Sequence, residues 1–113
     1  MREHIEQYLI KRFTDDARIL RGRATSLRSG ANMPGPDAAT SERMAGACED
    51  VADVLRGIDD IPVDNPRDGL MAVLSALEQR MHEHRSDSQL RAVYAGAISR
   101  LREIAEAAGE GGE

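Results

Sequence analysis

Apolar residues recur along the chain at intervals of three and four, the spacing that places side chains on one face of an α-helix. Four segments carry such a stripe, and the first of them consists of Ile5, Leu9, Phe13, Leu20, Ala24 and Leu27. The pattern predicts an all-α protein, an antiparallel four-helix bundle with helices at about 2–28, 38–57, 66–84 and 87–108.

Local signals place the helix boundaries. Residues 29–37 include two glycines and two prolines, which predict a flexible Gly/Pro loop. Asp37, Thr40 and Ser41 offer oxygens that can cap the second helix. The third helix is predicted to begin with Asn65 as its cap, Pro66 in the first helical position and Asp68 in the first turn.

The last two helices are predicted to form a tight hairpin. Residues 86–89 match a capping box, with Ser86 as the cap, so only a short turn separates the helices, which must then run antiparallel. Gly109 is expected to end the fourth helix and to leave 109–113 as a loose tail. Residues 1–113 are interpreted as a single helical domain, because their number suits one core.

Composition narrows the class of protein. Only 3% of the residues are aromatic, so the core must be aliphatic, which suits packing between helices. The net charge of −5 argues against general affinity for nucleic acid. The single Cys48 excludes an intrachain disulfide, and no segment has a continuous apolar run long enough to span a membrane, so a cytoplasmic location is expected.

Positive charge gathers in the first predicted helix. Residues 1–28 carry seven Lys and Arg against four acids, whereas residues 29–66 carry two against eight. Six of the seven basic side chains follow one another closely along the predicted helix: Lys11, Arg12, Arg18, Arg21, Arg23 and Arg28. Because Phe13 is the one aromatic residue among them and belongs to the apolar stripe, an acidic protein surface, including the chain's own second helix, is favoured over nucleic acid as their partner.

Glu49, Asp50 and Asp53 form an acidic cluster on the second predicted helix. This E-D-x-x-D run resembles the first acidic motif of the all-α nucleotide pyrophosphohydrolases, and the resemblance implies a magnesium site within a helical bundle. The second acidic motif of that family has no match, because Glu103 and Glu106 differ from it in form. At 100° per residue the cluster lies opposite the apolar stripe, so a solvated acidic face is expected.

Three further polar residues stand out. His82 and His84 are two apart on a helix, so their side chains diverge and cannot share one metal ion; a histidine pair in a last turn is expected instead. Asp16 falls within the first apolar stripe, where burial of a lone carboxylate is costly. Asp16 must therefore be exposed or paired, and Arg12, one turn earlier, is its predicted partner.

Several features predict a second buried surface. Gly22, Gly46 and Gly96 interrupt helices at the expense of helix stability, which close contact with another helix would offset. Ile10 and Ile19 lie off the main stripe of the first helix. In so small a chain this second surface suggests a homodimer. The tentative partner-binding residues are Ile10, Arg18, Ile19, Arg21 and Arg23.

The function expected from these patterns is a non-enzymatic protein–protein interaction or regulatory module that self-associates. The sequence has no recognisable nucleophile and base, phosphate-binding loop or cysteine metal cluster, so no catalytic residue, cofactor or metal is assigned. Two alternatives remain: a metal-dependent nucleotide hydrolase with Glu49, Asp50 and Asp53 as ligands, and nucleic-acid binding through the basic first helix.

Overall fold

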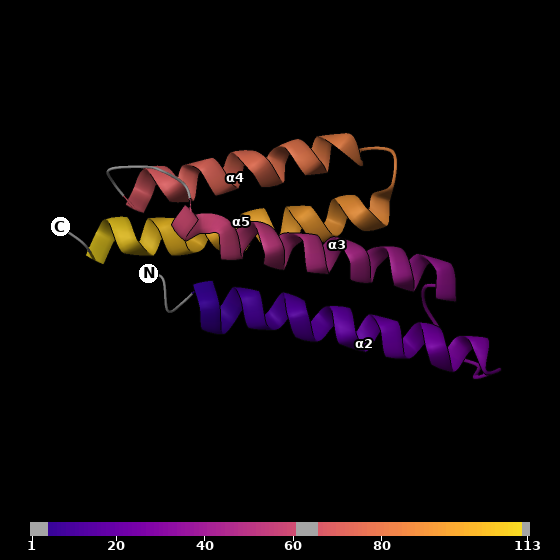
Figure 1. Cartoon of the computed structure of the whole chain (residues 1–113). Helices are drawn as coiled ribbons and strands as arrows, with labels where there is room; N and C mark the ends of the chain where they lie inside the picture. Colours follow the sequence, from indigo (N-terminus) through magenta and orange to yellow (C-terminus); the bar gives the residue numbers. More distant parts are fainter. Residues whose placement is uncertain (1–4, 61–65, 112–113) are drawn as a thin grey trace.

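The computed structural model describes residues 5–60 and 66–111. Its elements, in chain order, are η1 (Ile5–Ile10), α2 (Lys11–Arg28), α3 (Ala38–Arg56), η2 (Gly57–Asp60), α4 (Pro66–Glu83) and α5 (Ser88–Gly111). The four α-helices run alternately in opposite directions (Figure 1). The predicted all-α antiparallel four-helix bundle is therefore confirmed.

Most helix boundaries lie where the capping signals predicted them. Asp37 caps α3, because its Oδ1 accepts a 2.8 Å hydrogen bond from the backbone N–H of Thr40. That bond lowers the pKa of the Asp37 carboxyl. Helix α4 begins at Pro66 with Asp68 in its first turn. The predicted cap at Asn65 lies outside the described residues.

Two boundaries of α5 differ from the prediction. The cap is Asp87 and not Ser86: its Oδ1 accepts hydrogen bonds from the backbone of Gln89 and Leu90, which lower the pKa of the Asp87 carboxyl. A carboxylate accepts such bonds more strongly than a hydroxyl does. Gly109 does not end the helix, which continues to Gly111. Glycine permits a left-handed stop without requiring one.

The first helical segment starts with a π-helical stretch, η1, before it continues as α2. A π-helix has more residues per turn than an α-helix, so an α-helical projection misplaces its side chains. Leu9 is buried and Ile10 is partly buried against the core. The expectation that Ile10 lies off the apolar stripe is therefore wrong.

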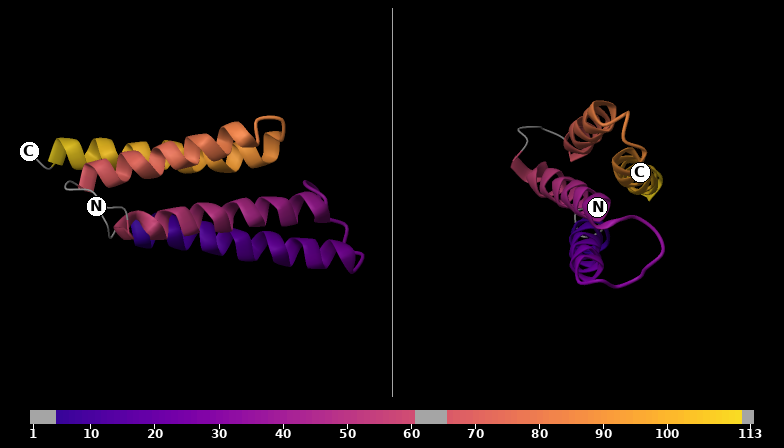
Figure 2. Two further views of the ribbon diagram at one scale, coloured as in Figure 1. Left: turned by 45° about the horizontal axis from the view of Figure 1, so that its top comes forward. Right: turned by 90° about the vertical axis from the view of Figure 1, so that its right-hand side faces the viewer.

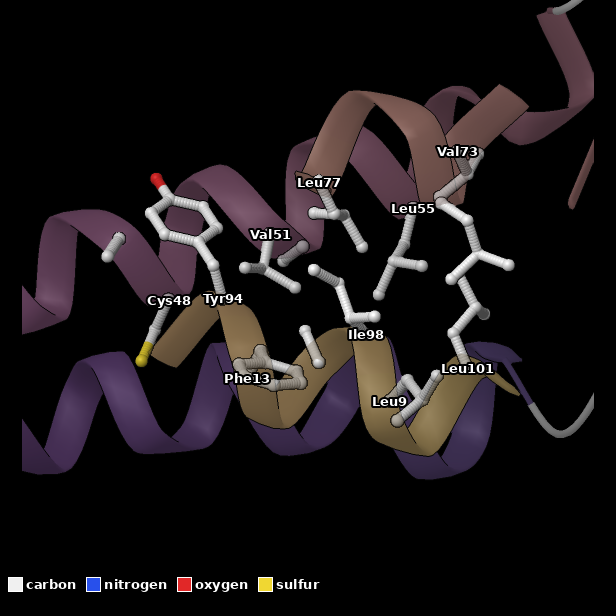
Figure 3. Close-up of a cluster of buried hydrophobic side chains, with 14 of the residues drawn as sticks. Leu9, Phe13, Cys48, Val51, Leu55, Val73, Leu77, Tyr94, Ile98 and Leu101 are labelled. Atoms are coloured by element: carbon white, nitrogen blue, oxygen red, sulfur yellow. The ribbon is translucent and has the colours of Figure 1, made fainter. Parts of the chain in front are cut away.

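Aliphatic side chains from all four α-helices form the core (Figure 3). Val51 and Leu55 of α3, Leu77 of α4 and Leu101 of α5 are fully buried. Helix α3 holds a central place, with α2 packed along one side of it and the α4–α5 pair on the other (Figure 2). The bundle thus depends on α3, which contacts every other helix.

One side of the bundle is open. Helix α2 packs along α3 but, over the described residues, has no comparable contact with α4 or α5. The N-terminal η1 reaches α5, so the opening begins beyond that end of the helical pair. A closed four-helix bundle would bring α2 and α5 together along their length. Here a groove separates them.

The loop between α2 and α3 is held by Arg23. Its guanidinium donates hydrogen bonds of 2.6 Å to the carbonyl of Pro34 and of 3.0 and 3.1 Å to the carbonyl of Pro36. Gly30 and Gly35 have φ angles of 101° and 108°, which only glycine adopts readily. Arg23 therefore ties the predicted loop to the helix that precedes it.

Candidate docking groove

The groove between α2, α3 and α5 encloses about 400 Å³ and has an apolar floor. Its floor consists of Phe13, Leu20, Met44, Cys48 and Val93. Phe13 and Cys48 are buried in the core, while the other three are partly buried against it. The floor is therefore the outer surface of the hydrophobic core, left uncovered where α2 and α5 part.

The two walls of this docking groove differ in character. Helix α2 contributes Ile19, whose side chain is 64% exposed, together with Arg12 and Asp16. Helix α5 contributes Ala92, Gly96 and Arg100. The α5 wall is low because its residues, apart from Arg100, have little or no side chain. The groove thus combines an apolar floor with a few charges at its rim, as binding sites commonly do.

The rim charges are unequally satisfied. Arg12 Nε lies 3.9 Å from Asp16 Oδ2, and both side chains are about half exposed. The predicted intrahelical pairing of Asp16 is therefore confirmed, although the contact is long. Arg100 has no hydrogen bond or ion pair with any residue that the structure describes. The α5 wall consequently presents to the groove an arginine that forms no ion pair with the described residues.

Cys48 lies on the floor of the groove with only 3% of its surface exposed. Burial, aided by the negative charges of Asp16 and Glu49, raises the pKa of its thiol to about 11. A thiol of this kind stays protonated at neutral pH and is a poor nucleophile. Cys48 therefore acts as a small apolar residue.

The five tentative partner-binding residues do not form one surface. Ile19 lies at the groove, Arg18 is exposed beside it and forms a 3.0 Å ion pair with Asp15, and Ile10 packs against the core. Arg21 faces α3 and Arg23 holds the loop. Of the five, only Ile19 belongs to the docking groove.

The arginines of the basic first helix are matched largely by acids of the same chain. Arg21 Nη2 lies 2.7 Å from Glu49 Oε2 on α3, and both amino groups of Arg28 bind the carboxylate of Glu42. The attraction predicted between the basic segment and the acidic segment thus occurs within one molecule. Such exposed pairs stabilise a fold only slightly, but they leave less free charge for nucleic acid.

The three residues of the acidic cluster of α3 contact different partners. Glu49 pairs with Arg21, and Asp53 Oδ1 lies 2.9 Å from Arg56 Nη1. Asp50 Oδ2 accepts a 2.7 Å hydrogen bond from the Tyr94 hydroxyl and lies 2.6 Å from Arg80 Nε. The expected solvated face therefore holds for Glu49 and Asp53, but Asp50 is half-buried toward α4 and α5. No group of three metal-binding side chains occurs in the described part of the chain.

The two histidines have separate surroundings. The ring of His84 stacks on Tyr94, with centroids 5.7 Å apart and planes within 2° of parallel. His82 is exposed, with its Nε2 3.4 Å from Arg85 Nη1. The prediction that their side chains diverge is confirmed, and His84 extends the aromatic contact beside the Asp50 network.

The helix glycines are not explained by contacts within one chain. An added Cβ would meet no atom within 4 Å at Gly22, Gly46 or Gly96. Close approach of another helix in the same molecule therefore does not require any of them. Gly96 lies on the α5 wall of the docking groove, and Gly22 follows Ile19 by one turn of α2. Gly46 is exposed on α3 and does not line the groove.

A second depression, of about 580 Å³, lies between α4 and α5. Its lining mixes the apolar Met81 and Ile98 with charged residues, and an ion pair of 2.6 Å between Arg102 and Glu78 joins its two walls. Because the chain's own side chains bridge this depression, it is less suited than the docking groove to accept an apolar partner.

Comparisons with known proteins add no family to this description. The chain matches no family model, and no similarity to a curated protein or to a solved structure was found. Among the described residues no helix has the length and apolar character needed to cross a membrane. The fold and the groove therefore define the class: an all-α helical bundle that is open along one side.

Sequence patterns identified only part of this site. The sequence pointed to Ile19, an apolar residue off the main stripe of its helix, and to Gly96, a glycine inside a helix. It did not point to Arg100, since nothing in the spacing of that residue reveals that α2 and α5 separate. The alanine-rich surface of the fourth helix was the one available signal that its outer face is special.

Proposed function

We propose that this chain is a non-enzymatic protein–protein interaction or regulatory module whose docking groove holds the apolar side of a helix. The observation that carries this proposal is that, over the described residues, α2 has no contact with α5 comparable to its packing on α3, which leaves the apolar floor of the groove uncovered. Contiguous apolar surface at the mouth of a groove is typical of helix-binding sites.

The charges at the rim indicate what kind of helix fits. Arg100 forms no hydrogen bond or ion pair within the described residues, so a helix with a carboxylate beside its apolar stripe is favoured. An acidic protein partner is also expected from the sequence. The proposal adds that its carboxylate pairs with an arginine on α5. The arginines of α2 contribute less, because Arg21 and Arg28 are already paired with α3.

Binding is favoured over the two alternatives by the same geometry. Hydrolysis would need Glu49, Asp50 and Asp53 to converge on a metal ion, whereas each has its own partner on the protein. Nucleic-acid binding would need a continuous basic face, whereas the arginines of α2 are divided among carboxylates and loop carbonyls.

The test uses a designed amphipathic peptide with a Leu/Ile stripe flanked by Glu. The peptide is titrated into protein that carries 13C-labelled methionine methyl groups. Met44 lies in the groove, whereas Met81 lines the depression between α4 and α5 and Met71 is exposed on α4. We expect saturable shifts of the Met44 methyl resonance and none of Met71.

A peptide of the same composition with a scrambled stripe serves as the control and should leave Met44 unshifted. Absence of any Met44 shift at millimolar peptide would overturn the proposal. Shifts confined to Met81 would also contradict it, because binding would then occur between α4 and α5.

A further inference from the structure

We propose that the helix held in the docking groove is α2 of a second copy of this chain, with Ile19 of each copy seated in the groove of the other. The inference rests on the proposed function, since it names the occupant of the same groove. The arrangement is a two-fold dimer in which the two α2 helices lie side by side between the two α5 helices.

Ile19 is an exposed apolar side chain on the α2 wall of the groove. It is 64% exposed although it borders an apolar floor. One helix therefore supplies both a wall of the groove and a projecting residue that can fill another groove. A surface that contains both halves of a contact is self-complementary, as a two-fold interface requires.

The charges beside Ile19 match those of the facing groove. Asp16 precedes Ile19 by one turn of α2, and its cation, Arg12, is 3.9 Å away. Arg100 on the α5 wall has no partner within the described residues. When Ile19 of one copy enters the groove of the other, its Asp16 approaches the α5 wall that carries Arg100. The dimer thus supplies an ion pair that Arg100 does not form within the described residues of a single chain.

Gly96 on the α5 wall gains a role in this arrangement. An added Cβ would touch nothing within one chain, although glycine weakens a helix relative to alanine. A second α2 that lies against this wall would occupy the space above Gly96. Gly46, equally free of contacts but on α3 away from the groove, provides a matched control.

The mass in solution, measured by light scattering from micromolar to millimolar protein, tests the dimer. We expect wild type to approach twice the 12.3 kDa mass of one chain as concentration rises. Ile19→Glu should stay monomeric, and Met71→Glu, at an exposed methionine on α4, should dimerise as wild type does. A wild-type chain that remains monomeric, or an Ile19→Glu chain that dimerises, would overturn the inference.

Two further variants examine the contact itself. Arg100→Glu should weaken dimerisation about tenfold, because it faces Asp16 with a like charge, and the double variant Asp16→Arg/Arg100→Glu should restore most of the affinity. Gly96→Gln should weaken the dimer, whereas Gly46→Gln should not. Circular dichroism and urea midpoints establish that each variant is folded. Failure of the double variant to recover affinity would contradict the proposed contact.

The Met44 methyl resonance separates failure of this inference from failure of the proposed function. If wild type stays monomeric while the designed peptide still shifts Met44, the groove binds a foreign helix, and only the dimer is refuted. If the chain dimerises without a concentration-dependent shift of Met44, the copies associate elsewhere and the inference is also refuted. If wild type stays monomeric and the peptide also leaves Met44 unshifted, the proposed function falls as well.

Discussion

The hydroxyl of Tyr94 on α5 donates a 2.7 Å hydrogen bond to the carboxylate of Asp50 on α3. The same Asp50 oxygen lies 2.6 Å from Arg80 Nε on α4, so one carboxylate joins three helices. Tyr94 is buried, which makes its hydroxyl dependent on this acceptor. The contact links α3 to the α4–α5 hairpin on the side of the bundle away from α2.

Replacement of Tyr94 by Phe should lower the free energy of unfolding by about 1 kcal/mol, the typical worth of one intramolecular hydrogen bond. Asp50 keeps its ion pair with Arg80 in this variant, so no charge is left unpaired. Urea denaturation measures the effect, and Asp50→Asn, which retains an acceptor for Tyr94, should retain more stability than Asp50→Ala. An unchanged midpoint for Tyr94→Phe would show that the bond contributes nothing.

Cys48 should make the stability of the protein fall at alkaline pH. The folded chain raises the pKa of this thiol from 9.0 to about 11, so between these values the unfolded chain has lost a proton that the folded chain retains. Stability then decreases as pH rises, because the folded state binds more protons. Urea midpoints across this range should fall less steeply for Cys48→Ala. Equal slopes would contradict the assignment.

Arg23 and Arg18 lie on the same helix and should respond differently to truncation. Arg23→Ala removes the hydrogen bonds to the carbonyls of Pro34 and Pro36, and we expect a loss of about 1–2 kcal/mol. Arg18→Ala removes only an exposed pair with Asp15 and should cost less than about 0.5 kcal/mol. Thermal unfolding of the two variants provides the comparison. Equal losses would mean that the loop contacts of Arg23 do not stabilise the fold.

Ser41 is fully buried in α3, and its hydroxyl has no hydrogen-bond partner among the described residues. Ser41→Ala should stabilise the protein by about 1 kcal/mol, since it removes an unsatisfied polar group and improves helix propensity. Ser75→Ala, at an exposed position of α4, gains from helix propensity alone and should stabilise less. A loss of stability in Ser41→Ala would show that the hydroxyl is satisfied in solution.

Features that depend on neighbours in the chain could be predicted well. The apolar stripes located all four helices, and Asp37 and Pro66 marked helix starts because a cap or a first-turn proline acts over only a few residues. The predictions for Ile10 and Gly109 were wrong because more than one backbone conformation was compatible with the local sequence. The same residues can form a π-helical or an α-helical turn, and a glycine can lie within a helix or end it. Composition therefore does not distinguish these outcomes.

The groove could not be predicted in the same way. Ile19 and Gly96 were recognisable as exceptions, but their helices are separated by α3 and α4 in the chain, and no local pattern states which helices touch. Asp50 likewise seemed to belong to an exposed acidic face until α4 and α5 supplied Arg80 and Tyr94. The numbers of charged residues predicted attraction between the first two helices, but they did not show that Arg21 pairs with Glu49.

The pattern of apolar residues and capping signals thus specified four amphipathic helices and their order, because these follow from the period of the backbone and from hydrogen bonds between near neighbours. Which helices pack together follows from the folded arrangement alone, in which α2 packs on α3 and diverges from α5, so that a groove lined by Arg100 opens between them. The pairing of distant helices depends on how whole faces fit in space, and that fit is a property of the assembled molecule.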